Sequence, residues 1–206
     1  MNNINTIIFD LGAVILNIDY HKTMDAFAKL GVADVANFYS KQQQTTLFDA
    51  IETGKITEHS FLQKLQESTT NASIAAVQNA WNALLLDLPE ERLALIKELK
   101  KEYSILLLSN TNAIHIDAFK KQLGAEKWEE FSLLFDKMYL SHEVGLRKPN
   151  KDIFHLILNE HSLKAENTLF IDDSPQHIKA AKEIGIRSHH LLDDEDILML
   201  FPGRVQ

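Results

Sequence analysis

The chain has 206 residues, of which 45% are hydrophobic and 24% are charged, and its formal net charge is −8. This is the composition of an ordinary globular protein, long enough for one good core and a small second one. The acidic balance argues against nucleic acid as a partner, because phosphate backbones attract concentrated lysine and arginine. The absence of cysteine excludes disulfides, thiolate catalysis and zinc–cysteine sites. Without an apolar run of membrane-spanning length or a signal-peptide pattern, we expect a cytoplasmic protein with no membrane partner.

The first chemical signal lies close to the start of the chain. An apolar run that begins at Ile7 ends in Asp10 and is followed by Gly12. Such a run predicts a buried strand that carries its final carboxylate to the carboxyl edge of a sheet, where open α/β sheets bind ligands. An aspartate at this position is also common as a simple turn residue. Its role therefore depends on what the rest of the chain brings to the same edge.

The segment that follows contains no strand-like run. Apolar residues at helical spacing predict four short helices, over residues 19–30, 46–52, 57–66 and 73–86. Gly31 is a plausible end for the first of them, and Thr57 a plausible N-cap for the third. We expect these helices to form a lid inserted after the first strand, with hinges at residues 16–19 and 86–89.

Alternation of helices and strands resumes at Pro89, which suits a first helical turn. Buried strands are predicted over 104–110, 137–141 and 167–173, with a last strand over 187–192. Helices are predicted between them, over 113–122, after Pro149, and from Ser174 and Pro175 to Gly185, whereas the segment through Trp128 and Phe131 gives no clear period. The expected fold class is α/β, a doubly wound and mostly parallel sheet with an inserted all-helical cap.

Three of the buried strands end in polar residues, and parallel strands bring their carboxyl ends to one crevice. Lys148 precedes a helix beside them. Two or three carboxylates with a lysine and a hydroxyl make a site for Mg²⁺ and phosphate, since Mg²⁺ prefers oxygen ligands. The polar ends are Asp10, the pair Ser109 and Asn110, and the pair Asp172 and Asp173.

These groups suit phosphoryl transfer to a side chain. Mg²⁺ would offset the repulsion between Asp10 and an anionic substrate, while Lys148 and Ser109 hold the phosphoryl oxygens as charge spreads onto them. Asp10 could then attack phosphorus and form an aspartyl-phosphate, which water hydrolyses. A small phosphorylated metabolite is the expected partner of the site.

In its four motifs the chain resembles the haloacid dehalogenase superfamily of phosphatases. Asp10 with Gly12 matches the first motif, Ser109 the second, Lys148 the third, and the pair Asp172 and Asp173 the fourth. The resemblance implies that Asp10 is the nucleophile and that Ser109, Asn110 and Lys148 bind phosphate. Mg²⁺ would be held by Asp10, the Gly12 carbonyl and Asp173, with support from Asp172.

The resemblance extends over nearly the whole chain. It implies a Rossmann-like catalytic core over residues 1–16 and 89–206 and a helical cap over 17–88. The sequences around Asp10, Ser109 and Lys148 are most similar to bacterial sugar-phosphate phosphatases of the glucose-1-phosphate type. The resemblance does not imply an oligomeric state.

Gly12 departs from the pattern of many phosphatases in the superfamily, which place a second aspartate there to protonate the leaving group. Glycine supplies a backbone carbonyl but no proton, and general acid–base help is typically worth about 10² to 10⁴ in rate. Either the leaving group needs little protonation, as an anomeric oxygen does, or another residue donates the proton. Asp19, His21 and His177 are the candidates.

Two other functions fit some of the residues. A protein that binds Mg²⁺ and phosphate, or a partner through its cap, without useful turnover is consistent with Gly12. A metal-independent 2-haloacid dehalogenase would need a cation for the substrate carboxylate, yet no arginine precedes Arg92. Arg147 could assist phosphate binding or lie on the surface, and the acidic turn 193–196 is expected to cap the last helix through Asp194 or a neighbour.

Overall fold

The computed structural model describes residues 3–35 and 46–204. In these residues five parallel strands form one sheet with the strand order β3-β2-β1-β4-β5, which confirms the predicted α/β class and parallel sheet. From β1 at the centre the chain runs outward through β2 to β3, then crosses to β4 on the other side of β1 and runs outward to β5, as in a doubly wound fold. The strands are β1 (Thr6–Phe9), β2 (Ser104–Ser109), β3 (Lys137–Leu140), β4 (Thr168–Asp172) and β5 (Arg187–His190).

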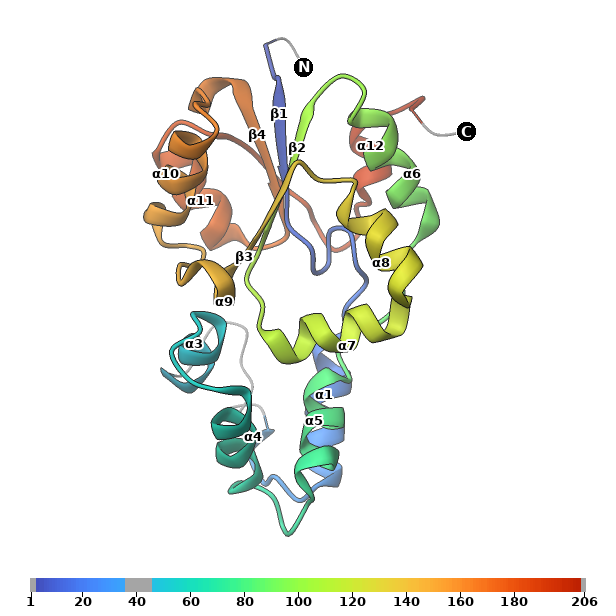
Figure 1. The fold of residues 1–206 in the computed structure, drawn as a ribbon, viewed down its shortest axis with the longest axis vertical. Helices are drawn as coiled ribbons and strands as arrows, with labels where there is room; N and C mark the ends of the chain where they lie inside the picture. The colour runs from blue at the N-terminus through green and yellow to red at the C-terminus, as the bar shows by residue number, and fades with distance from the viewer. Residues whose placement is uncertain (1–2, 36–45, 205–206) are drawn as a thin grey trace.

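Helices cover both faces of the sheet (Figure 1). Alternate residues of a strand point to opposite faces, so Ile7 and Phe9 pack on one side of β1 and Ile8 on the other. The first face packs against α6 (Glu90–Leu99), α7 (Ala113–Leu123), α8 (Ala125–Ser132) and α12 (Ile197–Leu200). The second packs against α10 (Lys151–Glu160) and α11 (Pro175–Glu183), with α9 (Ser141–Val144) and the 3₁₀ turn η1 (Ala165–Asn167) completing the chain.

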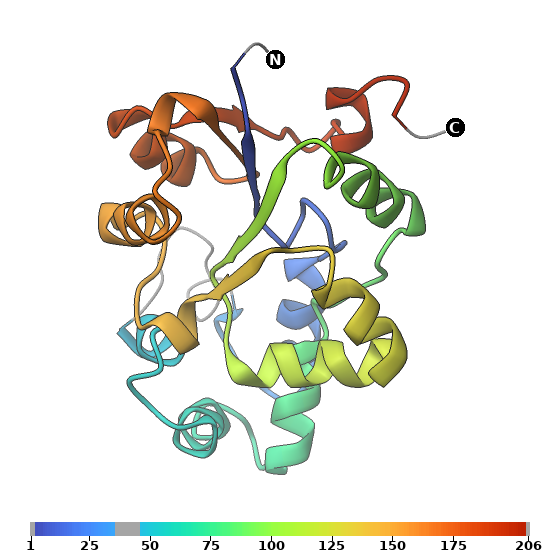
Figure 2. The same cartoon turned by 45° about the horizontal axis from the view of Figure 1, so that its top comes forward.

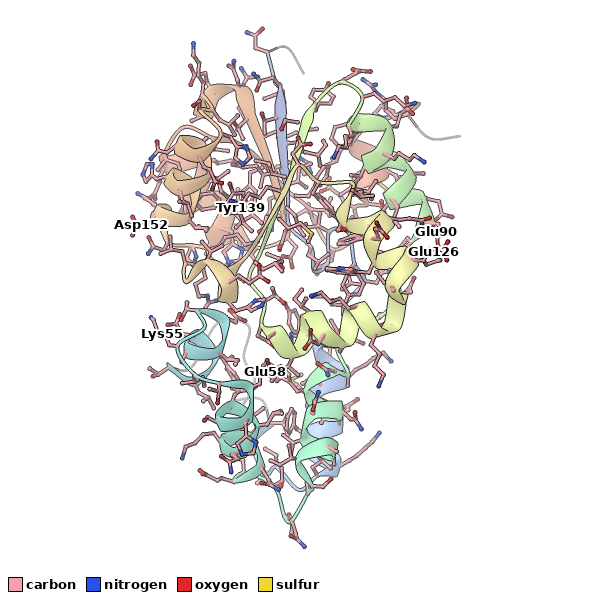
Figure 3. The ribbon with its side chains drawn as sticks, viewed as in Figure 1. Lys55, Glu58, Glu90, Glu126, Tyr139 and Asp152 are labelled. Atoms are coloured by element: carbon pink, nitrogen blue, oxygen red, sulfur yellow. The ribbon has the colours of Figure 1, made fainter. Side chains whose placement is uncertain are left out.

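The second layer is filled by aromatic and aliphatic side chains. Tyr139 of β3 is 1% exposed and packs in the cluster that contains Phe154 of α10 and Phe170 of β4. Figure 3 shows Tyr139 within the body of the molecule, whereas Asp152 lies at its outer edge. Within α10, Phe154 therefore lies on the face that packs against the sheet, and Asp152 lies on the exposed face.

Four helices lie together beyond the carboxyl ends of the strands, away from both termini (Figures 1 and 2). We call them the helical insertion. Their capping residues Asp19, Thr57 and Ser73 each accept a hydrogen bond from a backbone N–H of the first turn. The helices are α1 (Tyr20–Lys29), α3 (Thr46–Glu52), α4 (Glu58–Gln66) and α5 (Ile74–Asn82).

The helical insertion has its own apolar cluster. Phe48, Phe61 and Trp81 are at most 5% exposed, with Phe48 stacked on Trp81 at 5.4 Å between ring centroids. Ile114 of α7 also belongs to this cluster, so the insertion packs on the rest of the molecule as well as on itself.

The chain enters and leaves the helical insertion through two paired segments. Asn17 N–H donates to the Asp87 carbonyl at 3.0 Å, and Leu86 N–H donates to the Asn17 carbonyl at 3.0 Å. Arg92 of α6 steadies this junction, because its guanidinium donates to Asn17 Oδ1 at 2.9 Å and to the Ile15 carbonyl at 3.2 Å. The predicted hinges thus lie side by side, and any movement of the insertion passes through both.

Several local predictions need correction. The segment through Trp128 and Phe131 is helix α8, and the last strand ends at His190. The acidic turn caps the last helix as predicted, and the capping residue is Asp196, which accepts from Leu198 N–H and pairs with Arg92 at 2.7 Å. Helix α11 does begin after Ser174 with proline at its first position, but the Ser174 side chain makes no capping hydrogen bond.

The apolar cluster of the helical insertion yields a stability prediction. Phe61→Ala removes a fully buried ring and should lower the free energy of unfolding by about 3–5 kcal/mol, measured by urea denaturation. Leu133→Ala, at a side chain that is 68% exposed, serves as the control and should change it by less than about 0.5 kcal/mol. Equal effects of the two substitutions would contradict the packing described.

Candidate active site

The carboxyl ends of β1, β2 and β4 bring the predicted residues together. Asp10 follows β1 directly, and its N–H donates to the Ile171 carbonyl at 3.0 Å, which continues the pairing with β4. Ser109 is the last residue of β2 and Asp172 the last of β4. All three are at most 7% exposed. The register of a parallel sheet, rather than nearness in sequence, therefore places them at one edge.

Lys148 lies between the two buried carboxylates. Its ammonium nitrogen is 2.8 Å from Asp10 Oδ1 and 2.7 Å from Asp172 Oδ2, and it donates to the Leu108 carbonyl at 2.9 Å. The lysine is 0% exposed. An ammonium has three protons, and these three oxygens accept all of them.

Asn110 fixes the backbone that carries this lysine. Its side-chain nitrogen donates to the Lys148 carbonyl at 2.8 Å, and its side-chain oxygen accepts from Lys148 N–H at 2.9 Å. The next bond, Lys148–Pro149, is cis. Both polar atoms of the Asn110 side chain are thus committed to the lysine backbone, and the predicted phosphate binding by Asn110 stays a prediction.

Asp172 and Asp173, at the end of β4, have different hydrogen-bond partners. Asp172 accepts from Ser174 N–H at 2.8 Å, and its Oδ1 lies 2.9 Å from Nδ1 of His177, a buried residue of α11. Asp173 accepts from Ser174 Oγ at 3.2 Å through its side chain and binds His190 Nε2 at 3.0 Å through its carbonyl. Asp172 is therefore fully engaged within the protein, whereas Asp173 lines the cavity described below.

The electrostatics of the cluster favour an added positive charge. Burial raises the pKa of Asp10 to about 8, and the negative charges of Asp172 and Asp173 add to the effect although Lys148 opposes it. The pKa of Asp172 is held below its usual range by Lys148 and His177 against the effect of burial. One lysine does not balance the negative charge of three clustered carboxylates. The excess negative charge is one reason why the pKa of Asp10 is raised.

The donor atoms of the cluster fit a hard divalent cation. Asp10, Asp172 and His177 each offer a ligand atom, and these atoms all lie within 4.8 Å of one another. Gly12 and Asp173, the other predicted ligands, line the adjoining cavity. A set dominated by carboxylate and carbonyl oxygens suits Mg²⁺. The ligand assignment itself stays a prediction, and His177 was expected only as a candidate acid.

A cavity of about 480 Å³ lies between this cluster and the helical insertion. Asp10, Ser109 and Asp173 line one part of it, while Phe48 and Trp81 of the insertion line another. The ring of His115, at the start of α7, stacks on Trp81 at 4.8 Å. Trp81 is thus both a core residue of the insertion and a wall of the cavity.

Two charged residues of the cavity lie where α3 meets the loop before Lys148. Arg147 is 3.2 Å from Asp49 Oδ1 and 3.1 Å from Glu52 Oε2, so it is not a surface residue, whereas its buried Nε has no hydrogen-bond partner among the described residues and its help in phosphate binding stays a prediction. Sequence reasoning missed Glu52, because a glutamate at the end of an amphipathic helix gives no signal of the surface it faces. Among the candidate acids, Asp19 caps α1 and His21 is exposed, and only His177 lines the cavity.

Comparison with known proteins gives consistent matches. Residues 4–185 match the model of the haloacid dehalogenase-like hydrolase family. A D-ribitol-5-phosphate phosphatase of Bacteroides thetaiotaomicron is 31% identical over 186 residues, which cover 90% of each chain. A glyceraldehyde 3-phosphate phosphatase of Methanocaldococcus jannaschii is 27% identical over 86% of this chain and 70% of its own length.

Solved structures agree with these matches. A HAD-family enzyme of Bacteroides thetaiotaomicron, crystallised with magnesium and inorganic phosphate, superposes with a TM-score of 0.85 at 32% identity, covering 97% of this chain and 100% of that one. The predicted resemblance to phosphatases of this superfamily is confirmed, and the predicted cofactor, Mg²⁺, agrees with it. In the described residues no helix is long and apolar enough to cross a membrane.

The buried lysine yields a pH-dependent prediction. Lys148→Met leaves Asp10 and Asp172 buried without their cation, which should cost about 3–5 kcal/mol of stability near neutral pH. Losing the cation raises the pKa of both carboxyls in the folded protein, and because that of Asp10 is already about 8, the cost should shrink as the pH falls mainly through proton uptake by Asp172. Urea unfolding from about pH 8 to about pH 5 measures this dependence.

Lys151→Met is the matched control. Lys151 pairs with Glu183 at 2.6 Å, but its side chain is 46% exposed, so its loss should cost less than about 0.5 kcal/mol at any pH. A Lys148→Met protein whose deficit did not vary with pH would refute the charge balance described for this cluster.

Proposed function

Because the chain belongs to the haloacid dehalogenase-like hydrolases, we propose that it is a Mg²⁺-dependent phosphatase that hydrolyses small phosphate monoesters through an aspartyl-phosphate on Asp10. The observation that carries the proposal is the buried Asp10 carboxylate, which lines the cavity and lies 2.8 Å from Lys148. A nucleophile of this kind needs a fixed position and an ionised carboxylate.

The residues of the cluster would divide between metal and phosphate. Asp10, the Gly12 carbonyl and Asp173 would hold Mg²⁺, with Asp172 in support. Bound there, Mg²⁺ would supply positive charge that keeps Asp10 ionised and polarises a phosphoryl oxygen. The three carboxylates around one lysine leave an excess of negative charge, which Mg²⁺ would offset.

Ser109 and Lys148 would hold the phosphoryl group in line with Asp10. The Ser109 hydroxyl lines the cavity at the end of β2 and can donate to one phosphoryl oxygen. Lys148 would partly exchange its contact with Asp10 for a phosphoryl oxygen, and the Asn110 clamp keeps it in reach. Such preorganised donors act on the charge that develops in the transition state.

The cavity favours a small, polar leaving group. Its volume of about 480 Å³ is at the lower end of ligand sites, and its wall combines aromatic rings with charged groups. The two curated relatives compared above act on D-ribitol 5-phosphate and on glyceraldehyde 3-phosphate. A sugar or polyol phosphate is the substrate class that fits both the cavity and these relatives.

The catalytic residues and the residues that would contact the leaving group come from two parts of the chain. We take residues 1–16 and 89–206 as the catalytic core and residues 17–88 as the cap, of which the structure describes 17–35 and 46–88. The cap would close the cavity above Asp10 and select the leaving group. Its paired hinge segments at Asn17 and Leu86 would carry that movement.

The alternative functions lack a supporting observation. A haloacid dehalogenase needs a free cation for the substrate carboxylate, and Arg147 in the cavity is already paired with Asp49 and Glu52. The other alternative is a binding protein without turnover. The phosphate-release assay that tests the phosphatase also tests this alternative.

Phosphate release tests the proposal. A panel of sugar and polyol phosphates with p-nitrophenyl phosphate should show release that needs Mg²⁺ and stops with EDTA. Asp10→Asn should lower kcat on the order of 10³-fold or more, because it removes the nucleophile. Asp19→Asn, a substitution at the cap of α1 outside the cavity lining, is the control and should retain activity. Binding of Mg²⁺ and phosphate without release from any ester would establish the binding protein instead.

A further inference from the structure

Hydrolysis of a sugar or polyol phosphate raises a problem that the residues at the first motif do not solve. The departing alkoxide is a strong base and needs a proton, yet Gly12 has no side chain to give one. A Cβ at Gly12 would lie 3.0 Å from Ile18 Cδ1, so the space beside this backbone is filled by an apolar side chain. The proton must come from another wall of the cavity.

Among the described residues, five carboxyl or imidazole groups line the cavity: Asp10, Glu52, Asp173, His115 and His177. The two aspartates belong to the nucleophile and metal site, and His177, whose Nδ1 is bonded to Asp172, lies in the same cluster as Asp10, on the sheet side of the cavity. Both ring nitrogens of His115 are engaged, Nδ1 with Asn112 Nδ2 at 3.1 Å and Nε2 with the Trp81 carbonyl at 3.2 Å. Glu52 has no other assigned role.

Glu52 ends α3 on the side of the helical insertion that faces the core. Its side chain is 14% exposed, and its Oε2 lies 3.1 Å from Arg147 Nη2 without the geometry of a hydrogen bond. Arg147 directly precedes Lys148, so Glu52 meets the cavity from the side opposite to the sheet, near the lysine that would hold the phosphoryl group.

The surroundings keep Glu52 near the point of half-protonation at neutral pH. Burial raises its pKa to about 7, and Asp49 adds to the rise, while Arg147 and Lys148 oppose it. Helices α4 and α9, which contact α3, carry Glu58 and His142 as further titratable groups. A carboxylic acid with such a pKa is well matched to donate and recover a proton at physiological pH.

We propose that Glu52 is the general acid that replaces the aspartate missing at position 12. As Asp10 Oδ forms its bond to phosphorus, the bond from phosphorus to the leaving oxygen breaks, and the proton of the Glu52 carboxyl passes to that oxygen. The resulting Glu52 carboxylate is stabilised by Arg147. It then takes a proton from the water that attacks phosphorus, and the bond from phosphorus to Asp10 breaks, which releases phosphate and restores both the Asp10 carboxylate and the Glu52 acid. The assignment rests on the phosphatase function proposed above.

The test compares leaving groups of different acidity in Glu52→Gln. A substituted carboxamide keeps the shape of the side chain but cannot donate the proton, so kcat/KM for alkyl phosphates such as D-ribitol 5-phosphate should fall by about 10² or more. Release from p-nitrophenyl phosphate should change little, because p-nitrophenolate leaves without protonation. In the wild-type protein kcat/KM for the alkyl ester should fall above about pH 7, and this fall should be absent in Glu52→Gln.

Asp49→Asn is the matched control. Asp49 lies on the same helix and also pairs with Arg147, at 3.2 Å, but its side chain is 44% exposed and does not line the cavity. Asp49→Asn lowers the pKa of Glu52 but keeps its carboxyl, so the control should move the pH at which the alkyl-ester rate falls and leave the ratio of alkyl to aryl ester rates below that pH unchanged. An equal loss with both esters in Glu52→Gln, or the same changed ratio in Asp49→Asn, would overturn the assignment. Absence of release from every ester by the wild-type protein would instead refute the phosphatase itself.

Discussion

A lysine buried between two carboxylates is the interaction on which the site depends. Lys148 is 0% exposed and binds Asp10, Asp172 and the Leu108 carbonyl, so it joins the ends of β1, β4 and β2 at one point. Burying such charges is costly unless every partner is present, and here the sheet register supplies the partners. The same constraint explains the Asn110 clamp, since an ammonium can fill this position only if its backbone is fixed.

The helical insertion completes what the sheet begins. The sheet edge offers carboxylates, a hydroxyl and a lysine, which suit phosphate and metal, but it offers no wall for a leaving group. The insertion supplies that wall with Phe48, Trp81 and Glu52. The pairing of Arg147 with Asp49 and Glu52 ties α3 to the loop that carries Lys148. The position of the insertion and the placement of the lysine are therefore linked through one guanidinium.

The sequence was informative where burial leaves a simple pattern. Buried parallel strands are continuous apolar runs, so the positions of Asp10, Ser109 and Asp172 at their ends could be predicted. Helix α8 was missed because two large apolar residues, Trp128 and Phe131, are too few to establish a helical period over eight residues. The orientation of Glu52 was also beyond prediction, because it depends on how separate helices pack. Pairings such as Arg92 with Asp196 span 104 residues and have no local pattern.

The central claim is that Asp10 becomes phosphorylated during turnover. Its most direct test is rapid acid quenching during hydrolysis of a phosphate ester, followed by proteolysis and mass spectrometry of the peptide that contains Asp10. The account predicts a phosphorylated Asp10 that forms with Mg²⁺, disappears as substrate is exhausted, and is absent with EDTA. Rapid release of phosphate with no phosphorylated Asp10 at any time in the first turnover would contradict it and would indicate direct attack by water.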